Sequence, residues 1–189
     1  MTTWFESSAL ANFERFLPDP SWGPEGRVLV QVGVWAGDAT AWLLDHALVL
    51  GDTLHDVDTF AGTPGEHDEA AASEAYGRYR EMKREKDPLL CVLTSRCTSD
   101  VFFEHFPDEA WADFVYVDGD HSFAQVARDV ENAWRSVKPG GILACDDYQW
   151  YTPERRYDRP YPALANFLAL HAGEYEVLED GYQLWLRKA

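Results

Sequence analysis

The sequence has little of several features that would assign it to a particular class of protein. It contains three cysteines and no Cys-x-x-Cys pair, which argues against a disulfide framework or a structural zinc site and predicts a reduced, cytoplasmic protein. No apolar run approaches the length of a membrane span, and the first residues lack a basic stretch followed by an apolar one. We therefore expect neither a membrane-spanning segment nor a signal peptide.

Basic residues are also scarce. Lys and Arg number 16 against 33 Asp and Glu, which gives a net charge of −17. Such a surface repels phosphate backbones, so a nucleic-acid substrate is disfavoured and a small-molecule partner is expected. The sequence leaves open whether the chain forms a homo-oligomer.

Hydrophobic patterning is well developed, with short apolar runs alternating with amphipathic segments. The predicted strands cover residues 27–33, 53–57, 89–94, 114–117 and 142–145, and the predicted helices cover 4–17, 39–50, 69–86, 99–106, 122–137 and 161–172. Residues 138–141, "KPGG", are expected to end a helix. This order predicts an α/β fold with a doubly wound, mostly parallel sheet.

The C-terminal pattern differs from the rest, because residues 175–179 and 183–187 flank Asp180-Gly181, a strong hairpin signal. The sheet should therefore end in an antiparallel hairpin. We expect a single domain over residues 1–189, with an N-terminal helix and linker in 1–24, a helical cover in 69–86 and an acceptor-side loop in 148–161.

Two features at the ends of the first two strands predict a nucleotide site. The loop "QVGVWAGDAT" carries Gly33 and Gly37 in a G-x-x-x-G spacing, not the G-x-G-x-x-G of dinucleotide oxidoreductases. Asp58 ends the second strand, where a carboxylate can accept both ribose hydroxyls of an adenosine. Alone, the glycines could form a simple turn and Asp58 could be a loop residue; together they favour an adenosine site.

Acidic residues follow the next two strands. Asp118 and Asp120 come after the fourth strand, and Asp146 and Asp147 after the fifth. In adjacent parallel strands these side chains would converge and repel one another, and a Mg²⁺-type cation would relieve the repulsion. Asp147 could instead be a turn residue. His121 suits general-base work near neutral pH, or it could simply begin a helix.

The longest motifs resemble a known family. "VLVQVGVWAGDAT", "VDTFAGTPG", "FVYVDGDHSFAQVARDVENAWRSVKPGGILACDDY" and "DGYQLWLRK" are similar to class I S-adenosylmethionine-dependent methyltransferases. Most similar is the small-molecule family that includes metal-dependent sugar O-methyltransferases. The resemblance spans roughly residues 25–148 and the last hairpin. It implies S-adenosylmethionine as cofactor, a divalent cation and a small hydroxylated acceptor.

The resemblance also implies roles for single residues. The positions that match the cofactor site are Gln31, Gly33, Gly37, Asp58, Phe60, Thr98 and Ser99. The first three would surround the methionine part, Asp58 would bind ribose, Phe60 would flank the adenosine and the last two would lie near adenine. Gln31 is a departure, because many relatives carry glutamate there. For the metal, the matching positions are Asp118, Asp146 and Asp147, and Asp120 matches the general base.

The segment 148–161, "YQWYTPERRYDRPY", follows the acidic residues. Its aromatic residues suit a sugar or flat acceptor, and its arginines suit a phosphate or carboxylate. It could equally be a packed loop whose arginines offset an acidic surface. Two further alternatives stay open: a methyltransferase that needs no metal, and a non-catalytic adenosine-binding module.

Overall fold

The computed structural model of the chain describes residues 3–17, 26–63, 67–88, 91–106 and 110–189. Within them the chain forms two compact units, Met1–Thr98 and Ser99–Ala189. Some predicted features lie outside the described residues: the linker with Pro18 and Pro20 after the first helix, part of the loop after the second strand at 64–66, and the start of the third strand at 89–90.

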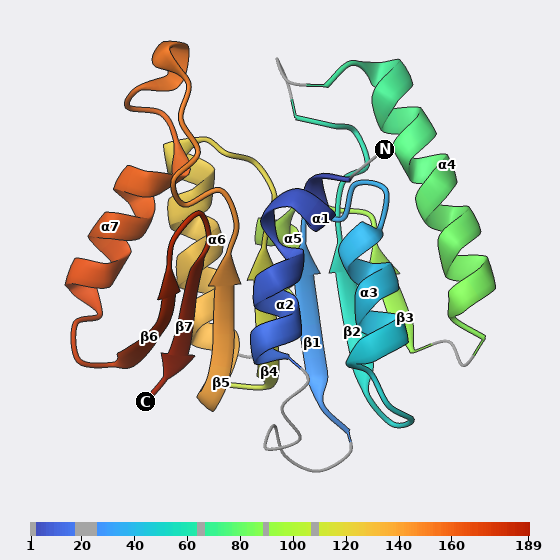
Figure 1. Cartoon of the computed structure of the whole chain (residues 1–189), viewed down its shortest axis with the longest axis horizontal. Helices are drawn as coiled ribbons and strands as arrows, with labels where there is room; N and C mark the ends of the chain where they lie inside the picture. The colour runs from blue at the N-terminus through green and yellow to red at the C-terminus, as the bar shows by residue number, and fades with distance from the viewer. Residues whose placement is uncertain (1–2, 18–25, 64–66, 89–90, 107–109) are drawn as a thin grey trace. The chain divides into compact units, whose positions relative to one another are not determined.

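The first unit is a parallel sheet whose strands are connected by helices (Figure 1). Its strands β1 (Val28–Val32), β2 (Thr53–Val57) and β3 (Val92–Ser95) lie in the order β3-β2-β1, and both pairings are parallel. Parallel neighbours need a crossover, which α3 (Asp38–His46) and α4 (Glu69–Lys86) supply. The loops after β1 and β2 therefore begin at the same edge of the sheet.

Two predicted helices of this unit, at 4–17 and 39–50, differ from those in the structure. The single helix expected at 4–17 is two helices, α1 (Trp4–Ser8) and α2 (Leu10–Phe16), which meet at Ala9 with φ −108°. The hydroxyls of Ser7 and Ser8 both donate to the carbonyl of Trp4 at 2.9 Å, and such bonds compete with helix continuation.

The second difference is the early end of α3. This helix ends at His46 instead of residue 50. The Asp52 carboxylate accepts the Val49 N–H at 2.9 Å and pairs with Arg27 at 2.5 Å, which turns the chain toward β2.

The second unit combines a parallel strand pair with an antiparallel hairpin (Figure 1). Its elements are α5 (Ser99–Glu104), β4 (Ala112–Val117), α6 (Phe123–Ser136), β5 (Val137–Cys145), the 3₁₀ helix η2 (Pro153–Arg155), α7 (Pro160–Leu170), β6 (Tyr175–Asp180) and β7 (Leu184–Lys188). The strand order is β4-β5-β7-β6, with β4 and β5 parallel and β7 antiparallel to both β5 and β6. The predicted α/β class and terminal hairpin are confirmed.

The "KPGG" segment belongs to a strand, which corrects the prediction that it only ends a helix. β5 begins at Val137 directly after α6, and the register with β4 shifts between Ala112 and Phe114. A Cβ at Gly141 would lie 2.9 Å from the Asp113 carbonyl oxygen. The glycine therefore permits a close backbone approach at a bulge, which a periodicity argument does not reveal.

Apolar side chains fill the space between sheet and helices in this unit. The Phe114 and Trp185 rings stack with centroids 5.7 Å apart, and Trp134 of α6 meets Phe167 of α7 edge to face at 5.6 Å. Among the described residues, no helix is both long and apolar enough to cross a membrane.

Candidate functional site

The loop after β1 is held by Asp58, at the end of β2. Oδ2 of Asp58 accepts the backbone N–H groups of Val34 at 2.7 Å and Trp35 at 2.9 Å, and Oδ1 accepts that of Phe60 at 2.6 Å. The partly exposed carboxylate thus fixes the glycine loop. Its oxygens offer more lone pairs than these three bonds use, so capacity remains for ribose hydroxyls.

Both glycines of this loop adopt left-handed backbone conformations, with φ 82° at Gly33 and 86° at Gly37. Gly37 is also packed: a Cβ there would lie 2.8 Å from Cδ2 of Tyr79 and 2.6 Å from Cε of Met82, both on α4. Gln31 is buried beneath the loop, where its Nε2 donates to the Gly33 carbonyl at 2.9 Å. The hydrogen bond from its amide therefore holds the loop backbone at Gly33.

A buried carboxyl group lies next to Gln31. Oδ2 of Asp56 is bonded by the Thr40 hydroxyl at 3.0 Å and the Tyr79 hydroxyl at 2.9 Å, while the Thr40 hydroxyl also lies 3.2 Å from Oε1 of Gln31. Asp56 is fully buried, and its Oδ1 has no hydrogen-bond partner among the described residues. Burial raises the pKa of Asp56 to about 7.

Phe60 packs against α4. Its ring centroid lies 4.5 Å from that of Tyr76 and 5.1 Å from that of Tyr79, and the Phe60 side chain is 8% exposed. The Arg96 guanidinium lies 4.7 Å above the Tyr76 ring. Phe60 and Tyr79 are thus part of a buried cluster, against which the partly buried Tyr76 and Met82 of α4 pack.

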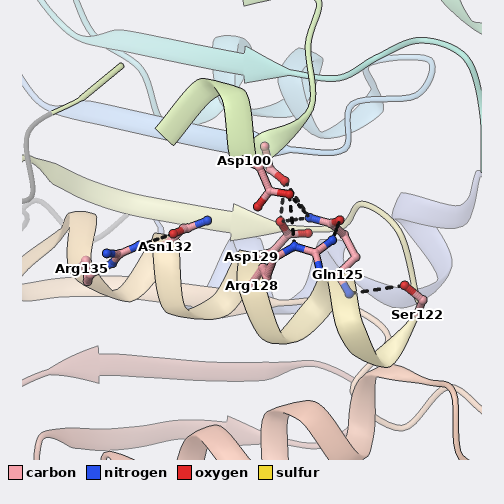
Figure 2. A network of polar contacts seen from close by, with 8 residues as sticks. Asp100, Ser122, Gln125, Arg128, Asp129, Asn132 and Arg135 are labelled. Carbon is pink, nitrogen blue, oxygen red and sulfur yellow. Dashed lines mark hydrogen bonds and ion pairs between the residues drawn. The ribbon is translucent and has the colours of Figure 1, made fainter. Parts of the chain in front are cut away.

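The two residues predicted near adenine differ in their surroundings. Thr98 is exposed, whereas Ser99 is buried and donates its hydroxyl to Oδ1 of Asp129 at 2.5 Å. Asp129 and Gln125 project from α6 toward Asp100 of α5 (Figure 2), and Nε2 of Gln125 donates to Asp129 at 2.9 Å. Burial raises the pKa of Asp129 to about 6. The Ser99 hydroxyl therefore connects α5 to α6 through its hydrogen bond with Asp129.

The second unit holds the acidic residues. β4 and β5 run parallel with Val117 opposite Cys145, and the Asp146 N–H donates to the Val117 carbonyl at 2.9 Å. The residues that follow both strands therefore meet at one edge, as predicted.

Three side chains gather at this edge. Asp118, His121 and Asp147 each offer one ligand atom, and these atoms all lie within 4.8 Å of one another. We call these three residues the acidic centre.

The side chains of Asp147 and His121 contact each other in this centre. Nε2 of His121 lies 3.0 Å from Oδ2 of Asp147, and the Tyr182 hydroxyl donates to Oδ1 of Asp147 at 2.5 Å. Burial acts to raise the pKa of Asp147, but the hydrogen bond and charge of His121, together with the Tyr182 bond, lower it. The backbone of Asp147 has φ 56°, a left-handed value that is uncommon outside glycine.

Asp146 points into the core instead. The buried Tyr116 hydroxyl donates to Oδ2 of Asp146 at 2.5 Å, and the Asp147 N–H donates to Oδ1 at 2.8 Å. Burial and the neighbouring Asp147 raise the pKa of Asp146. Tyr116 also lies 3.3 Å from Asp118, so it links Asp146 to the acidic centre.

Asp120 lies in the turn before α6. Its Oδ1 accepts the Ser122 N–H at 2.6 Å, and the Ser122 hydroxyl accepts the Gln125 N–H at 3.4 Å. Within the described part of the chain, the other oxygen of Asp120 makes no hydrogen bond. His121, in contrast, is directed at Asp147 and lies beside Trp150, with ring centroids 5.3 Å apart.

The sequence of residues 30–148 matches a family model described as a methyltransferase domain, and the match covers more than half of the chain. The chain belongs to this methyltransferase domain family. It is a class I S-adenosylmethionine-dependent methyltransferase, as the resemblance implied.

Solved structures with the same fold are distant in sequence. A Clostridium thermocellum protein provisionally described as an rRNA methylase superposes with a TM-score of 0.71 at 12% identity, over 96% of each chain. The O-methyltransferase from Bacillus cereus, in complex with S-adenosylhomocysteine, has a TM-score of 0.66 at 14% identity, over 99% of this chain and 84% of that one.

A third neighbour is TomG from Streptomyces achromogenes, an O-methyltransferase of tomaymycin synthesis, in complex with S-adenosylmethionine. It has a TM-score of 0.65 at 14% identity, over 95% of this chain and 81% of that one. At these identities the likeness shows the fold alone. No curated protein matches the chain.

Two tyrosines of this methyltransferase border the acidic centre without having been predicted. Tyr116 lies two residues before Asp118. Side chains two residues apart on a strand point to the same face, so the contact between these two residues could have been predicted from their spacing. Tyr182 lies in the turn between β6 and β7 and reaches Asp147 from 35 residues away. No local pattern indicates such a contact.

Proposed function

We propose that this methyltransferase transfers the methyl group of S-adenosylmethionine to a hydroxyl oxygen of a small molecule, such as a sugar or natural product, with help from a divalent cation of the Mg²⁺ type. The observation that carries the proposal is the acidic centre, with its ligand atoms within 4.8 Å of one another. The net charge of −17 supports a small acceptor rather than a nucleic acid.

The donor set fits a divalent cation. Two carboxylates and an imidazole nitrogen converge, and the His121 and Asp147 side chains are only 18% and 15% exposed. Asp118 and Asp147 would hold the ion. The third ligand would be either His121, whose nitrogen faces them, or Asp146, which the family resemblance implies. Imidazole suits transition metals better than Mg²⁺, so His121 as ligand would favour a Mn²⁺-like preference.

Asp120 is the proposed general base. One of its oxygens is bonded to the Ser122 N–H at 2.6 Å, which orients the carboxylate, and the other can accept a proton. The acceptor oxygen attacks the methyl carbon, the sulfur–methyl bond breaks with its electron pair going to sulfur, and the hydroxyl proton passes to Asp120. When bound, a divalent cation would acidify the acceptor hydroxyl. In the first unit, Asp58 and the glycine loop would hold the cofactor.

A second candidate is a methyltransferase that needs no metal. It is favoured by the 3.0 Å contact between His121 and Asp147, because a carboxylate that orients an imidazole is a common arrangement for a general base. In that reaction His121 would take the hydroxyl proton and Asp147 would stabilise the resulting imidazolium.

Thermal melting and chelation separate these functions. S-adenosylhomocysteine should raise the melting temperature, because a ligand that binds only the folded state stabilises it. EDTA should then abolish methyl transfer to a panel of hydroxylated acceptors while this thermal shift persists, and added Mg²⁺ or Mn²⁺ should restore turnover. Turnover unchanged by EDTA would establish the metal-free reaction. No thermal shift at saturating ligand would contradict cofactor binding itself.

The third metal ligand is identified by comparing two variants. Asp146→Asn and His121→Gln each remove one candidate donor. The substitution of the true ligand should raise the Mg²⁺ or Mn²⁺ concentration needed for half-maximal activity, while the other should leave that concentration unchanged.

A further inference from the structure

Arg159 carries hydrogen-bond donors that the protein does not use. Its guanidinium lies 5.0 Å from the ring centre of Tyr151 and 5.4 Å from that of Tyr161. Nη1 makes one long bond, 3.4 Å, to the Trp150 carbonyl, and the buried Nε has no hydrogen-bond partner among the described residues. Nε–H is one of the five N–H donors of the half-buried guanidinium, and leaving it desolvated and unpaired costs free energy.

Among the described residues, the neighbouring Asp158 carboxylate forms no ion pair with Arg159. Oδ1 of Asp158 accepts the Phe123 N–H at the start of α6, at 2.8 Å. Arg159 is itself the residue that precedes the first turn of α7, where the helix dipole favours a negative charge. A cation in that position does not stabilise the helix, whereas an anion bound beside it would interact favourably with both the guanidinium and the helix dipole.

Arg159 is connected to the acidic centre through Trp150. The Trp150 carbonyl meets Arg159, its N–H donates to the Asp147 carbonyl at 2.9 Å, and its ring lies 5.3 Å from that of His121. One residue thus contacts the arginine, a predicted metal ligand and the histidine. A small molecule with a hydroxyl at the acidic centre could extend past Trp150 toward Arg159.

We propose that Arg159 binds an anionic group, a carboxylate or a phosphate, of the methyl acceptor, with Tyr151 and Tyr161 flanking that group. The inference rests on the proposed function for the identity of the ligand as acceptor. Planar guanidinium groups bind both anions in a bidentate manner. With a net charge of −17 the protein repels anions in general, so saturable anion binding would require a specific cationic group such as this one.

Three probes of similar size test the proposal on the full chain, which is stripped of metal with EDTA and then dialysed free of the chelator, so that neither a metal nor EDTA carboxylates interfere. Benzoate and phenyl phosphate carry the two candidate groups, and benzyl alcohol is the neutral control. Each is titrated while the arginine Nε–H signals are followed by nitrogen-15 NMR, with the Arg159 signal assigned from its loss in Arg159→Lys. We expect saturable shifts of that signal with at least one anion and none with benzyl alcohol.

Two variants supply the matched comparison. Because Arg159→Lys lacks the Arg159 signal, the affinities of the variants are compared by isothermal titration calorimetry. Arg159→Lys keeps the charge but not the planar donors and should weaken anion binding about tenfold or more. Arg156→Lys, at an exposed position of the same loop, should leave binding unchanged. The tighter anion identifies the acceptor group as carboxylate or phosphate.

The proposal is overturned if benzyl alcohol binds as tightly as the anions, if the Arg159 signal of the unmodified protein does not move, or if both variants weaken binding equally. The S-adenosylhomocysteine thermal shift is measured in parallel. Its loss would refute cofactor binding, whereas the anion titration depends on neither turnover nor cofactor.

Discussion

Gly37→Ala should destabilise the protein through two separable effects at the glycine loop. The backbone there has φ 86°, and the left-handed conformation costs an L-residue about 1–2 kcal/mol. The new Cβ would also lie 2.8 Å from Cδ2 of Tyr79 and 2.6 Å from Cε of Met82. Met82 Cε is the end of a flexible side chain and can move aside.

The Tyr79 ring cannot move as easily. It is 1% exposed, and its hydroxyl is fixed by Asp56 at 2.9 Å and Thr94 at 2.6 Å. Overpacking of this kind costs about 1–3 kcal/mol. The total loss in the free energy of unfolding is therefore roughly 2–5 kcal/mol for Gly37→Ala.

Two other glycines isolate the components in urea denaturation experiments. Gly26 has φ 91° with nothing within 4 Å of an added Cβ, so Gly26→Ala should lose only the backbone cost, about 1–2 kcal/mol. Gly77 lies exposed in α4 with neither constraint, and Gly77→Ala should stabilise by about 0.5–1 kcal/mol. Equal losses in Gly37→Ala and Gly26→Ala would refute the packing of α4 against the loop.

Three further predictions concern the cofactor, the base and pH. Asp58→Asn replaces an acceptor of three backbone N–H groups and should weaken S-adenosylhomocysteine binding about tenfold or more by calorimetry, whereas unchanged affinity would contradict its role. Asp120→Asn should lower kcat by about a hundredfold or more with cofactor affinity retained, and His121→Gln should lower it less; the reverse order would make His121 the base. The folded-state pKa of Asp56, about 7, exceeds its usual 3.8, so the folded protein binds the proton more tightly and stability should fall as pH rises from about 4 to 7. Asp56→Asn should remove this slope in denaturation curves measured across that range.

Elements whose signal is local were predictable from the sequence. The helix at Glu69–Lys86 and the strand at Thr53–Val57 have the predicted bounds, because composition and turn residues define both ends. The first residues of β5 were not predictable, because Gly141 serves a bulge against the Asp113 carbonyl, and that contact depends on the neighbouring strand. Side-chain hydrogen bonds inside a helix, as at Ser7 and Ser8, are equally hidden from periodicity.

In the acidic centre, the meeting of the residues after β4 and β5 was predictable from the sequence, whereas the direction of single side chains was not. Strand adjacency brings Asp118 together with the residues after β5, and the sequence order was enough to predict it. It was not enough to decide which of two adjacent aspartates faces Asp118. That choice follows from the Tyr116 hydroxyl, which binds Asp146 at 2.5 Å, and from the φ of 56° at Asp147.

The orientation of His121 follows from the same backbone feature. With Asp146 held by Tyr116, the left-handed turn at Asp147 directs its carboxylate to the Tyr182 hydroxyl and to Nε2 of His121. The histidine is thereby fixed in a partly buried position within the acidic centre, although it also directly precedes Ser122, the N-cap of α6. If the turn is the cause, Asp147→Gly, which keeps the backbone conformation but removes the carboxylate, should release His121 and change the NMR chemical shifts of its ring protons. Unchanged ring-proton shifts of His121 in that variant would mean that other contacts orient the ring.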